Sequence, residues 1–180
     1  HSFPSNLPSK SINKAKKIIK NCVEALGIKN GPSNIDLIFD KDENPKIIEV
    51  GARIGATCLP ELVLYHTGID FTKAAIEIAC GGKPDLSIKK NLPCSAFILD
   101  SKLTGIMKNY KILEKFKNHP DILEWEVTAK PGDQVRQLKK GTDRIGKIVT
   151  KGSSANEAEN LARQFRLAFI IDFYRNSEGN

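Results

Sequence analysis

Apolar residues recur at helical spacing in the first part of the chain. Between Ser9 and Leu26 they return every three or four positions, which predicts an amphipathic helix that ends at Gly27. Two short runs rich in Ile, Leu, Val and Phe follow at 35–39 and 46–50, separated by the polar stretch DKDENP. Two apolar runs joined by a polar loop of this length predict an antiparallel hairpin.

Two short helices are predicted after the hairpin. Pro60 is placed to open the first helix, and Gly68 is placed to close it. Asp70 can cap the second helix, which is expected over residues 71–80. Residues 83–93 contain two prolines and are expected to form a boundary.

The second half has shorter patterns with turn residues between them. A capping box at Ser154 and Glu157 opens a predicted helix. Strands are predicted at 95–100, 122–128, 134–138, 145–150 and 169–173, a short helix at 112–117, and an extended lead-in at 1–8. The expected fold class is therefore α+β: an antiparallel sheet lobe with helices, followed by a small α+β module.

Composition and charge narrow the function classes. The chain has 180 residues, 40% apolar and 27% charged, which is typical of a globular protein rather than a disordered one. No apolar run reaches the roughly 18–20 residues of a membrane helix, so no membrane partner is expected. The net charge of +7 comes from spread lysines, so a solvated surface is favoured over nucleic-acid binding, which stays a weaker alternative. The four cysteines lack metal-binding spacing and are predicted to be buried thiols in the cytoplasm.

The hairpin carries the candidate chemistry. Asp36 lies in its first strand and Glu49 in its second, and a symmetric hairpin places them opposite, with Cβ atoms about 4.5–5.5 Å apart. Like charges in that position destabilise a sheet, so a shared proton, a basic side chain or a bound cation must offset the repulsion. Two carboxylates on a rigid hairpin suit Mg²⁺. The alternative is a register slip by one residue, or an edge position for Asp36 in water.

A third candidate follows the second strand. Arg53 lies four residues past Glu49, so in an extended chain it points to the same side. Its guanidinium suits a phosphate or a developing oxyanion, and a salt bridge to Glu49 or Asp36 is the alternative. Gly51 and Gly55 flank Arg53, and glycines let backbone N–H groups approach an anion closely.

The stretch from Asn34 to Gly82 resembles the C-terminal lobe of an ATP-grasp enzyme. The resemblance rests on a strand acid, a short loop, an E-x-N-x-R-like motif (here EVGAR), a proline-containing helix start and a G-[IV]-D helix. It is closest to the branch that contains L-amino-acid ligases and carbamoyl-phosphate-synthase-like proteins. The resemblance implies that residues 1–90 are the ATP-grasp C-terminal lobe and that 91–180 are a small α+β module.

The resemblance also implies a role for each matching residue. Asp36 and Glu49 would hold Mg²⁺, which Mn²⁺ can replace, against the phosphates of ATP, and Ile38 would touch the adenine. Arg53 would stabilise an acyl-phosphate intermediate. The substrate-contacting residues that it implies are Gly51, Gly55, Ala56 and His1. Many family members have asparagine, a further metal ligand, where this chain has Gly51, so one coordination position would be left to water.

The function implied by the resemblance is ATP-dependent carboxylate–amine ligation. The implied partners are a small-molecule carboxylate, an amine and an N-terminal lobe of the same protein that is missing here, and a homodimer is compatible. Carbamoyl-phosphate-type chemistry on bicarbonate and a non-catalytic nucleotide-binding module are the alternatives. Residues 91–180 show no catalytic constellation, and the isolated chain, which has its only methionine at Met107, is expected to be an inactive piece of a longer protein.

Overall fold

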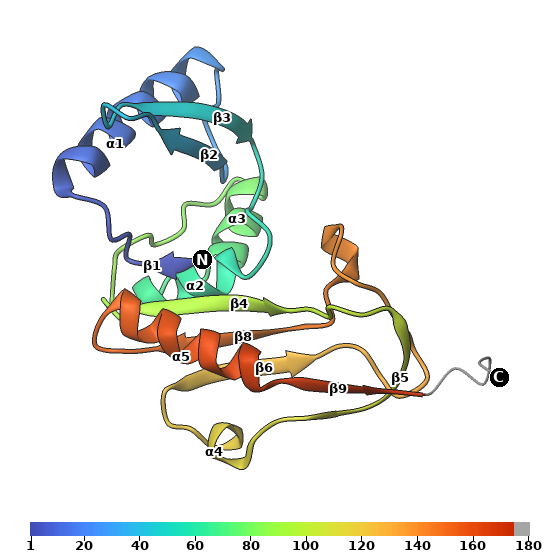
Figure 1. Ribbon diagram of the computed structural model, residues 1–180. Coiled ribbons are helices and arrows are strands. Elements are labelled where there is room, and N and C mark those ends of the chain that lie inside the picture. The colour runs from blue at the N-terminus through green and yellow to red at the C-terminus, as the bar shows by residue number, and fades with distance from the viewer. Residues whose placement is uncertain (175–180) are drawn as a thin grey trace. The chain divides into compact units, whose positions relative to one another are not determined.

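The computed structural model describes residues 1–174, which form two compact units. The hairpin unit is Ser5–Asn91. The sheet unit joins His1–Pro4 to the chain from Leu92 onward. Both units combine helices with antiparallel sheets, so the predicted α+β fold class is confirmed (Figure 1). None of the helices within 1–174 combines the length and the apolar character that crossing a membrane requires.

The hairpin unit follows the predicted order of elements. It contains α1 (Ser9–Ala25), β2 (Asn34–Phe39), β3 (Pro45–Gly51), α2 (Leu59–Thr67) and α3 (Phe71–Ala79). The helix α1 packs against β3, and α2 contacts α3. Gly68 ends α2 with a φ of 80°, a left-handed conformation that glycine adopts without strain. The Asp70 carboxylate caps α3 by accepting the Lys73 N–H at 2.8 Å.

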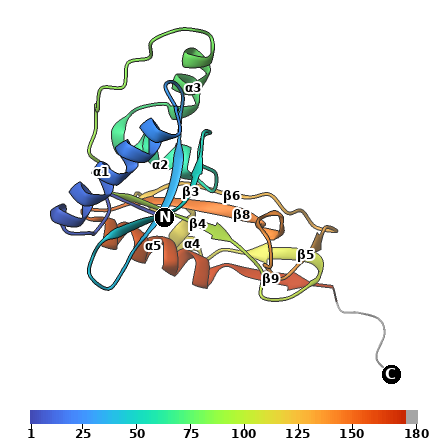
Figure 2. The same cartoon turned by 90° about the horizontal axis from the view of Figure 1, so that it is seen from above.

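The sheet unit contains two antiparallel sheets. The first has the order β1 (Ser2–Phe3), β4 (Cys94–Leu99), β8 (Gly146–Lys151), β6 (Ile122–Val127), and the second has the order β7 (Gln134–Val135), β5 (Gly105–Lys111), β9 (Ile170–Phe173). The helices are α4 (Glu114–Lys117) and α5 (Ala155–Ala168), with a 3₁₀ turn at Gly141–Asp143. Figures 1 and 2 show α5 running alongside β4 and β8, which it contacts.

The core of the sheet unit is centred on α5. Phe165 is fully buried, and its ring centroid lies 5.6 Å from that of Phe116 and 6.2 Å from that of Trp125. Ala158 and Ala162 are also fully buried, and their small side chains let the helix lie close to the sheet. Trp125 packs against this core, so its role is structural.

Some predictions for the sheet unit and for the cysteines were wrong in detail. The strand β5 was not predicted, and β7 is shorter than the predicted run at 134–138. Ser154 caps α5 by accepting the Glu157 N–H, but the Glu157 carboxylate accepts from the N–H and the hydroxyl of Ser153. Of the four cysteines only Cys58 and Cys94 are buried, whereas Cys80 is exposed. Burial raises the pKa of the Cys94 thiol to about 11.

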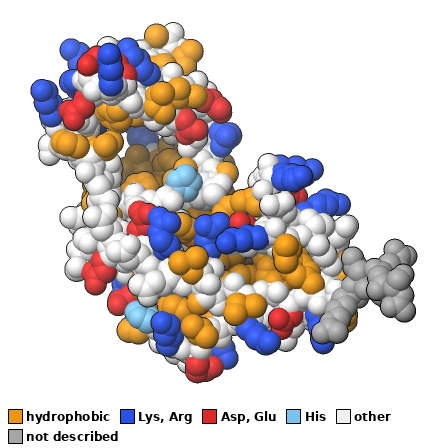
Figure 3. Space-filling view, viewed as in Figure 1, with side chains coloured by type: hydrophobic (Ala, Val, Ile, Leu, Met, Phe, Trp, Pro, Cys, Tyr) orange, Lys and Arg blue, Asp and Glu red, His pale blue; other side chains and the backbone are white. Residues whose placement is uncertain are grey.

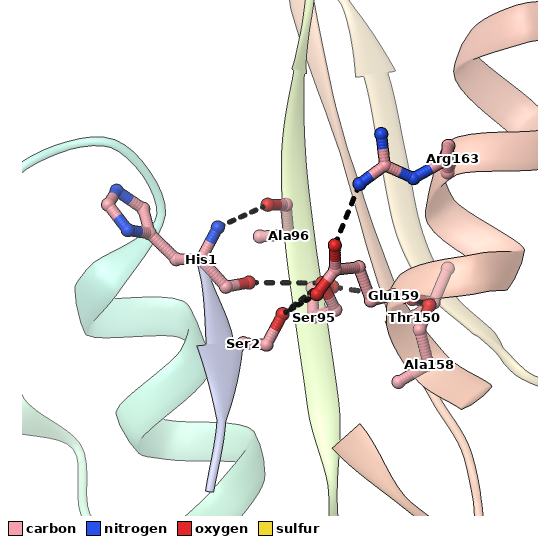
Figure 4. Close-up of polar contacts among 8 residues, drawn as sticks. All are labelled: His1, Ser2, Ser95, Ala96, Thr150, Ala158, Glu159 and Arg163. Carbon is pink, nitrogen blue, oxygen red and sulfur yellow. Dashed lines mark hydrogen bonds and ion pairs between the residues drawn. The ribbon is translucent and has the colours of Figure 1, made fainter. Parts of the chain in front are cut away.

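The extended lead-in forms a strand that the sequence did not predict. The Ser2 hydroxyl lies 3.0 Å from that of Ser95 and donates to the Glu159 carboxylate at 3.1 Å, while the Ser95 hydroxyl donates to the His1 carbonyl (Figure 4). Hydrogen bonds from Arg163 and from Ser2 lower the pKa of the Glu159 carboxyl. These polar contacts attach the first residues of the chain to β4 and α5.

Candidate active site

The hairpin brings the two predicted acids together. Asp36 of β2 is paired directly with Glu49 of β3, and both side chains are exposed. Residues paired in this way project to the same face of an antiparallel ribbon, with Cβ atoms within about 5.5 Å. The predicted pairing of Asp36 with Glu49 is therefore confirmed. Of the alternatives, the register does slip by one residue, but only between Asp36 and the turn, and Asp36 is exposed on a two-stranded ribbon, as the edge alternative predicts.

A β-bulge produces this pairing. Near the turn the strands pair as Phe39 with Pro45 and Leu37 with Ile47, a register that would place Asp36 opposite Ile48. The register shifts between Asp36 and Leu37, so Ile48 becomes an extra residue in β3. The turn is thus one residue tighter than in the symmetric hairpin that the sequence predicts, and the bulge restores the pairing of the two acids.

The two carboxylates have no basic partner in the described chain. No ion pair within residues 1–174 involves Asp36 or Glu49. The Arg53 guanidinium donates to the Ile54 carbonyl at 2.9 Å instead, so the alternative of a salt bridge to Asp36 or Glu49 is not observed. No basic side chain of the described chain therefore offsets the repulsion between the two carboxylates.

Exposed apolar side chains lie beside the acids on this strand pair. Ile38 is 57% exposed and Ile48 is 63% exposed, which is unusual for large aliphatic side chains. Ile38 lies two residues from Asp36 and therefore on the same face of β2. The face that carries the acids is thus part charged and part apolar, which suits a ligand that has both a phosphate chain and a flat ring.

The segment after β3 is shaped by close packing. Gly55 is buried, and a Cβ at this position would lie 2.6 Å from Asn34 Oδ1 and 2.6 Å from Leu59 Cδ1, so only glycine fits without movement. Ala56 is exposed. Thr57 and Cys58 have φ values of 56° and 66°, a left-handed conformation that is rare for side chains of these types. Strained backbone of this kind clusters at functional sites.

His1 belongs to the other unit. It pairs with the sheet unit through its backbone nitrogen, which donates to the Ala96 carbonyl at 3.1 Å. Its imidazole points away from the polar contacts of Ser2, Ser95 and Glu159 (Figure 4). The structure therefore does not gather His1 with Asp36, Glu49 and Arg53 in one compact unit.

The sheet unit has a polar cavity that the sequence analysis missed. The cavity has a volume of about 380 Å³, and both Arg136 and Arg144 line it. Neither guanidinium forms an ion pair within residues 1–174, whereas the Asp143 carboxylate accepts the N–H groups of Lys139 and Lys140 at 3.1 Å each. Asp133 and Asp143 line the cavity as well, so the charges around it are mixed. The sequence analysis placed Arg136 in the strand predicted at 134–138 and gave neither arginine a functional role.

Basic side chains elsewhere are dispersed. On the face shown in Figure 3, the lysine and arginine side chains of the described chain are scattered among acidic and apolar ones. Several of them form ion pairs, such as Lys89 with Asp85 and Lys111 with Asp172. This distribution is the one expected of a solvated surface.

The fold indicates a class of protein. The chain has the fold of the C-terminal part of ATP-grasp ligases, and the resemblance predicted from the sequence is confirmed. More particularly, residues 98–170 match the family described as L-amino acid ligase C-terminal domain 2. The matched residues lie in the sheet unit, outside the stretch from Asn34 to Gly82 on which the sequence resemblance rests.

Similar proteins of known structure extend over both units. Phosphoribosylglycinamide synthetase from Anaerococcus prevotii is 27% identical with a TM-score of 0.85, and the alignment covers 97% of this chain and 45% of that one. L-amino acid ligase from Bacillus licheniformis is 24% identical with a TM-score of 0.82, covering 97% and 44%. An uncharacterized protein, y4rH of Sinorhizobium fredii, is 24% identical over 90% of this chain and 34% of its own length. The chain thus spans less than half of the length of each relative.

Proposed function

We propose that this chain is the C-terminal part of an ATP-dependent carboxylate–amine ligase in which Asp36 and Glu49 hold the magnesium ion of Mg-ATP. The observation that carries the proposal is the direct pairing of two exposed carboxylates that have no basic partner in residues 1–174. A divalent cation offsets the repulsion that this pairing creates. The similarity to L-amino acid ligase in fold and in residues 98–170 supports the choice of reaction.

The donor atoms fit this metal. Mg²⁺ binds through one or two carboxylates and completes its octahedron with water and phosphate oxygens, and Mn²⁺ accepts the same oxygen ligands. When bound, the ion supplies positive charge beside the phosphates of ATP. Asp36 and Glu49 project from two strands of one hairpin, so the backbone fixes their separation.

Other residues of the hairpin unit would hold the nucleotide and the reacting groups. Ile38, exposed on the face that carries the acids, would contact the adenine ring. Transfer of the γ-phosphoryl group to a substrate carboxylate gives an acyl phosphate and ADP, and an attacking amine then releases phosphate. Arg53 would bind the oxygens that gain negative charge in these steps, because its guanidinium is exposed and free of carboxylate partners in the described chain.

Substrate contacts are the part of the proposal that rests most on the family resemblance. We propose Gly51 and Ala56 as contacts of the carboxylate substrate, and Gly55 through its backbone; the role that the resemblance implies for His1, a residue of the sheet unit, stays a prediction. The remaining residues of the site would come from an N-terminal lobe, since each relative extends beyond the matched part. The partners would be a small carboxylic acid and an amine, and the isolated chain would be inactive.

The test is a substrate screen on the full-length protein. With ATP and Mg²⁺, phosphate release is measured with the twenty amino acids, singly and in pairs, and with bicarbonate. We expect phosphate release that requires both an amino acid and the metal. Glu49→Gln should lower this release by more than about 100-fold, because about 100-fold is the upper end of the loss when only a supporting partner of a metal ligand is removed. Asp42→Asn is the matched control, because it removes the same charge from the turn of the same hairpin.

Each outcome of the screen separates the alternatives. Release with bicarbonate alone would favour carbamoyl-phosphate-type chemistry. If every substrate leaves ATP intact while the protein still binds ATP, the chain is a non-catalytic nucleotide-binding module. If Glu49→Gln behaves like Asp42→Asn, the acid pair does not hold the metal.

A further inference from the structure

A third polar side chain lies beside the acid pair. Asn34 is two residues before Asp36, so both project from the same face of β2. Its Nδ2 donates to Asp36 Oδ1 at 3.4 Å, a long hydrogen bond that aligns the two groups. The residue opposite Asn34 on β3 is Gly51, which has no side chain. A Cβ at position 51 would lie 3.5 Å from Arg53 Cγ and 3.5 Å from Arg53 Nε, so the side chain of Arg53 covers this glycine.

The other end of the Asn34 amide is fixed by Gly55. A Cβ at position 55 would lie 2.6 Å from Asn34 Oδ1 and 2.6 Å from Leu59 Cδ1, closer than real Cβ atoms approach, and 3.3 Å from Asn34 Cγ. Gly55 itself is buried. The amide is thus held between the backbone of Gly55 on one side and the Asp36 carboxylate on the other.

We propose that Asn34 is a positioning residue that orients the Asp36 carboxylate toward Glu49, and that Gly55 is glycine because it leaves the space for the amide of Asn34. This inference rests on the proposed function, since it concerns the same metal. Repulsion by Glu49 favours rotation of Asp36 away from the pair, and an amide N–H bonded to Asp36 Oδ1 opposes that rotation. A carboxylate that is already oriented loses less side-chain freedom when it binds an ion.

The experiment measures Mn²⁺ affinity of the chain by the relaxation rate of water protons, without ATP turnover. Asn34→Ala and Gly55→Ala are compared with wild type and with the double variant. We expect each single variant to weaken Mn²⁺ binding about tenfold, the loss usual for a supporting partner of a metal ligand. In the Asn34→Ala background, Gly55→Ala should weaken Mn²⁺ binding clearly less than it does in wild type, because the clash with the amide is gone and only the clash with Leu59 Cδ1 remains.

Matched controls and a fold measurement complete the design. Asn44→Ala removes an amide at the turn of the same hairpin, where it accepts from Lys14 at 3.0 Å, and Gly141→Ala adds a Cβ that meets nothing within 4 Å. Both should leave Mn²⁺ affinity unchanged. Thermal unfolding of every variant shows whether weaker binding comes from a lost fold, and Asn34→Ala, which creates no clash, keeps the test valid if Gly55→Ala does not fold.

The results distinguish this inference from the proposed function. If wild type binds Mn²⁺ and Glu49→Gln abolishes binding while Asn34→Ala does not change it, the role of Asn34 is refuted and the metal site stands. Independent losses in the double variant would show that Gly55 acts without Asn34, which also refutes the inference. Tighter binding by Asn34→Asp than by wild type would show direct ligation by position 34 instead of positioning. A wild-type chain that binds no Mn²⁺ would overturn both proposals.

Discussion

Two strand pairs that contain a β-bulge differ in how they arrange their charged residues. In the sheet unit, the bulge of β6 lies between Ile122 and Glu124, and Lys147 Nζ of β8 lies 2.8 Å from Glu124 Oε1. In the hairpin unit, the bulge of β2 and β3 sets Asp36 directly opposite Glu49. Lys147 is paired with Glu126 and reaches Glu124 diagonally, so opposite charges meet in this sheet, whereas like charges meet in the hairpin. The first arrangement favours the folded state, whereas the second destabilises it, and the proposed cation would offset that cost.

The two charged pairs also differ in how deeply the strands around them are buried. β6 and β8 belong to the sheet whose residues Ile148 and Trp125 pack into the core with Phe165. The strands β2 and β3 leave Ile38 and Ile48 mostly exposed. A surface that is apolar, acidic and open is costly for an isolated fold, which favours a binding role for the hairpin face.

The largest expected effect is the loss of the sheet-unit core. Phe165→Ala removes a fully buried ring that contacts Phe116 and Trp125, so the free energy of unfolding of this unit should fall by about 3–5 kcal/mol. Denaturant unfolding followed by Trp125 fluorescence measures the change. A loss below about 1 kcal/mol would show that the sheet unit does not depend on α5 for its stability.

A smaller loss is expected from the opposite-charge pair. Lys147→Gln removes the ammonium group that lies 2.8 Å from Glu124 Oε1, and the side chains of Lys147 and Glu124 are only 25% and 32% exposed. The free energy of unfolding should fall by about 1 kcal/mol, at the upper end of the range for surface pairs. The same denaturant titration measures it, and high salt should reduce the difference between variant and wild type. A variant as stable as wild type would contradict the stabilising role of this pair.

The matched change in the hairpin should have the opposite sign. Glu49→Gln removes the repulsion with Asp36, so the free energy of unfolding should rise by about 0.2–1 kcal/mol in the absence of divalent cations. Added Mg²⁺ should stabilise wild type and not the variant, because binding to the folded state shifts the equilibrium. A destabilised Glu49→Gln chain would show that Glu49 has a favourable partner within the fold and would remove the basis of the comparison.

Most elements could be predicted because local patterns determine them. The 3.6-residue spacing of apolar side chains located α1, and Gly68 and Asp70 marked helix ends whose capping contacts the structure contains. The pairing of Asp36 with Glu49 also followed from the hairpin. The predicted loop was wrong, however. The loop is one residue shorter than predicted, and the bulge at Ile48 restores the pairing of Asp36 with Glu49.

Long-range features could not be predicted in this way. The two-residue strand β1 pairs with Ser95 and Cys94, more than ninety positions away, and no local pattern encodes that contact. In β5, Lys108 and Asn109 interrupt the alternation of apolar and polar residues, and the register with β9 shifts at the same place. The contact of Gly55 with Asn34 and the cavity beside Arg136 likewise depend on tertiary packing.

The smallest expected effect concerns the acid at the hairpin turn, which contrasts with the acid pair on the strands. The Asp40 carboxylate accepts the N–H groups of Asn44 at 2.9 Å and of Asp42 at 3.0 Å, and these bonds, with Lys46 nearby, hold the pKa of Asp40 below its ordinary value of 3.8. Because the pKa is lower in the folded state, this group contributes stability above its unfolded value, and the contribution is lost as the pH falls through the folded value. The amide resonances of Asp42 and Asn44 should therefore titrate with a midpoint below 3.8, and Asp40→Asn should remove that titration while leaving Mn²⁺ binding at Asp36 and Glu49 intact. A midpoint above 3.8 would show that the turn does not stabilise the ionised form, and the electrostatic contrast between turn and strands would then fail.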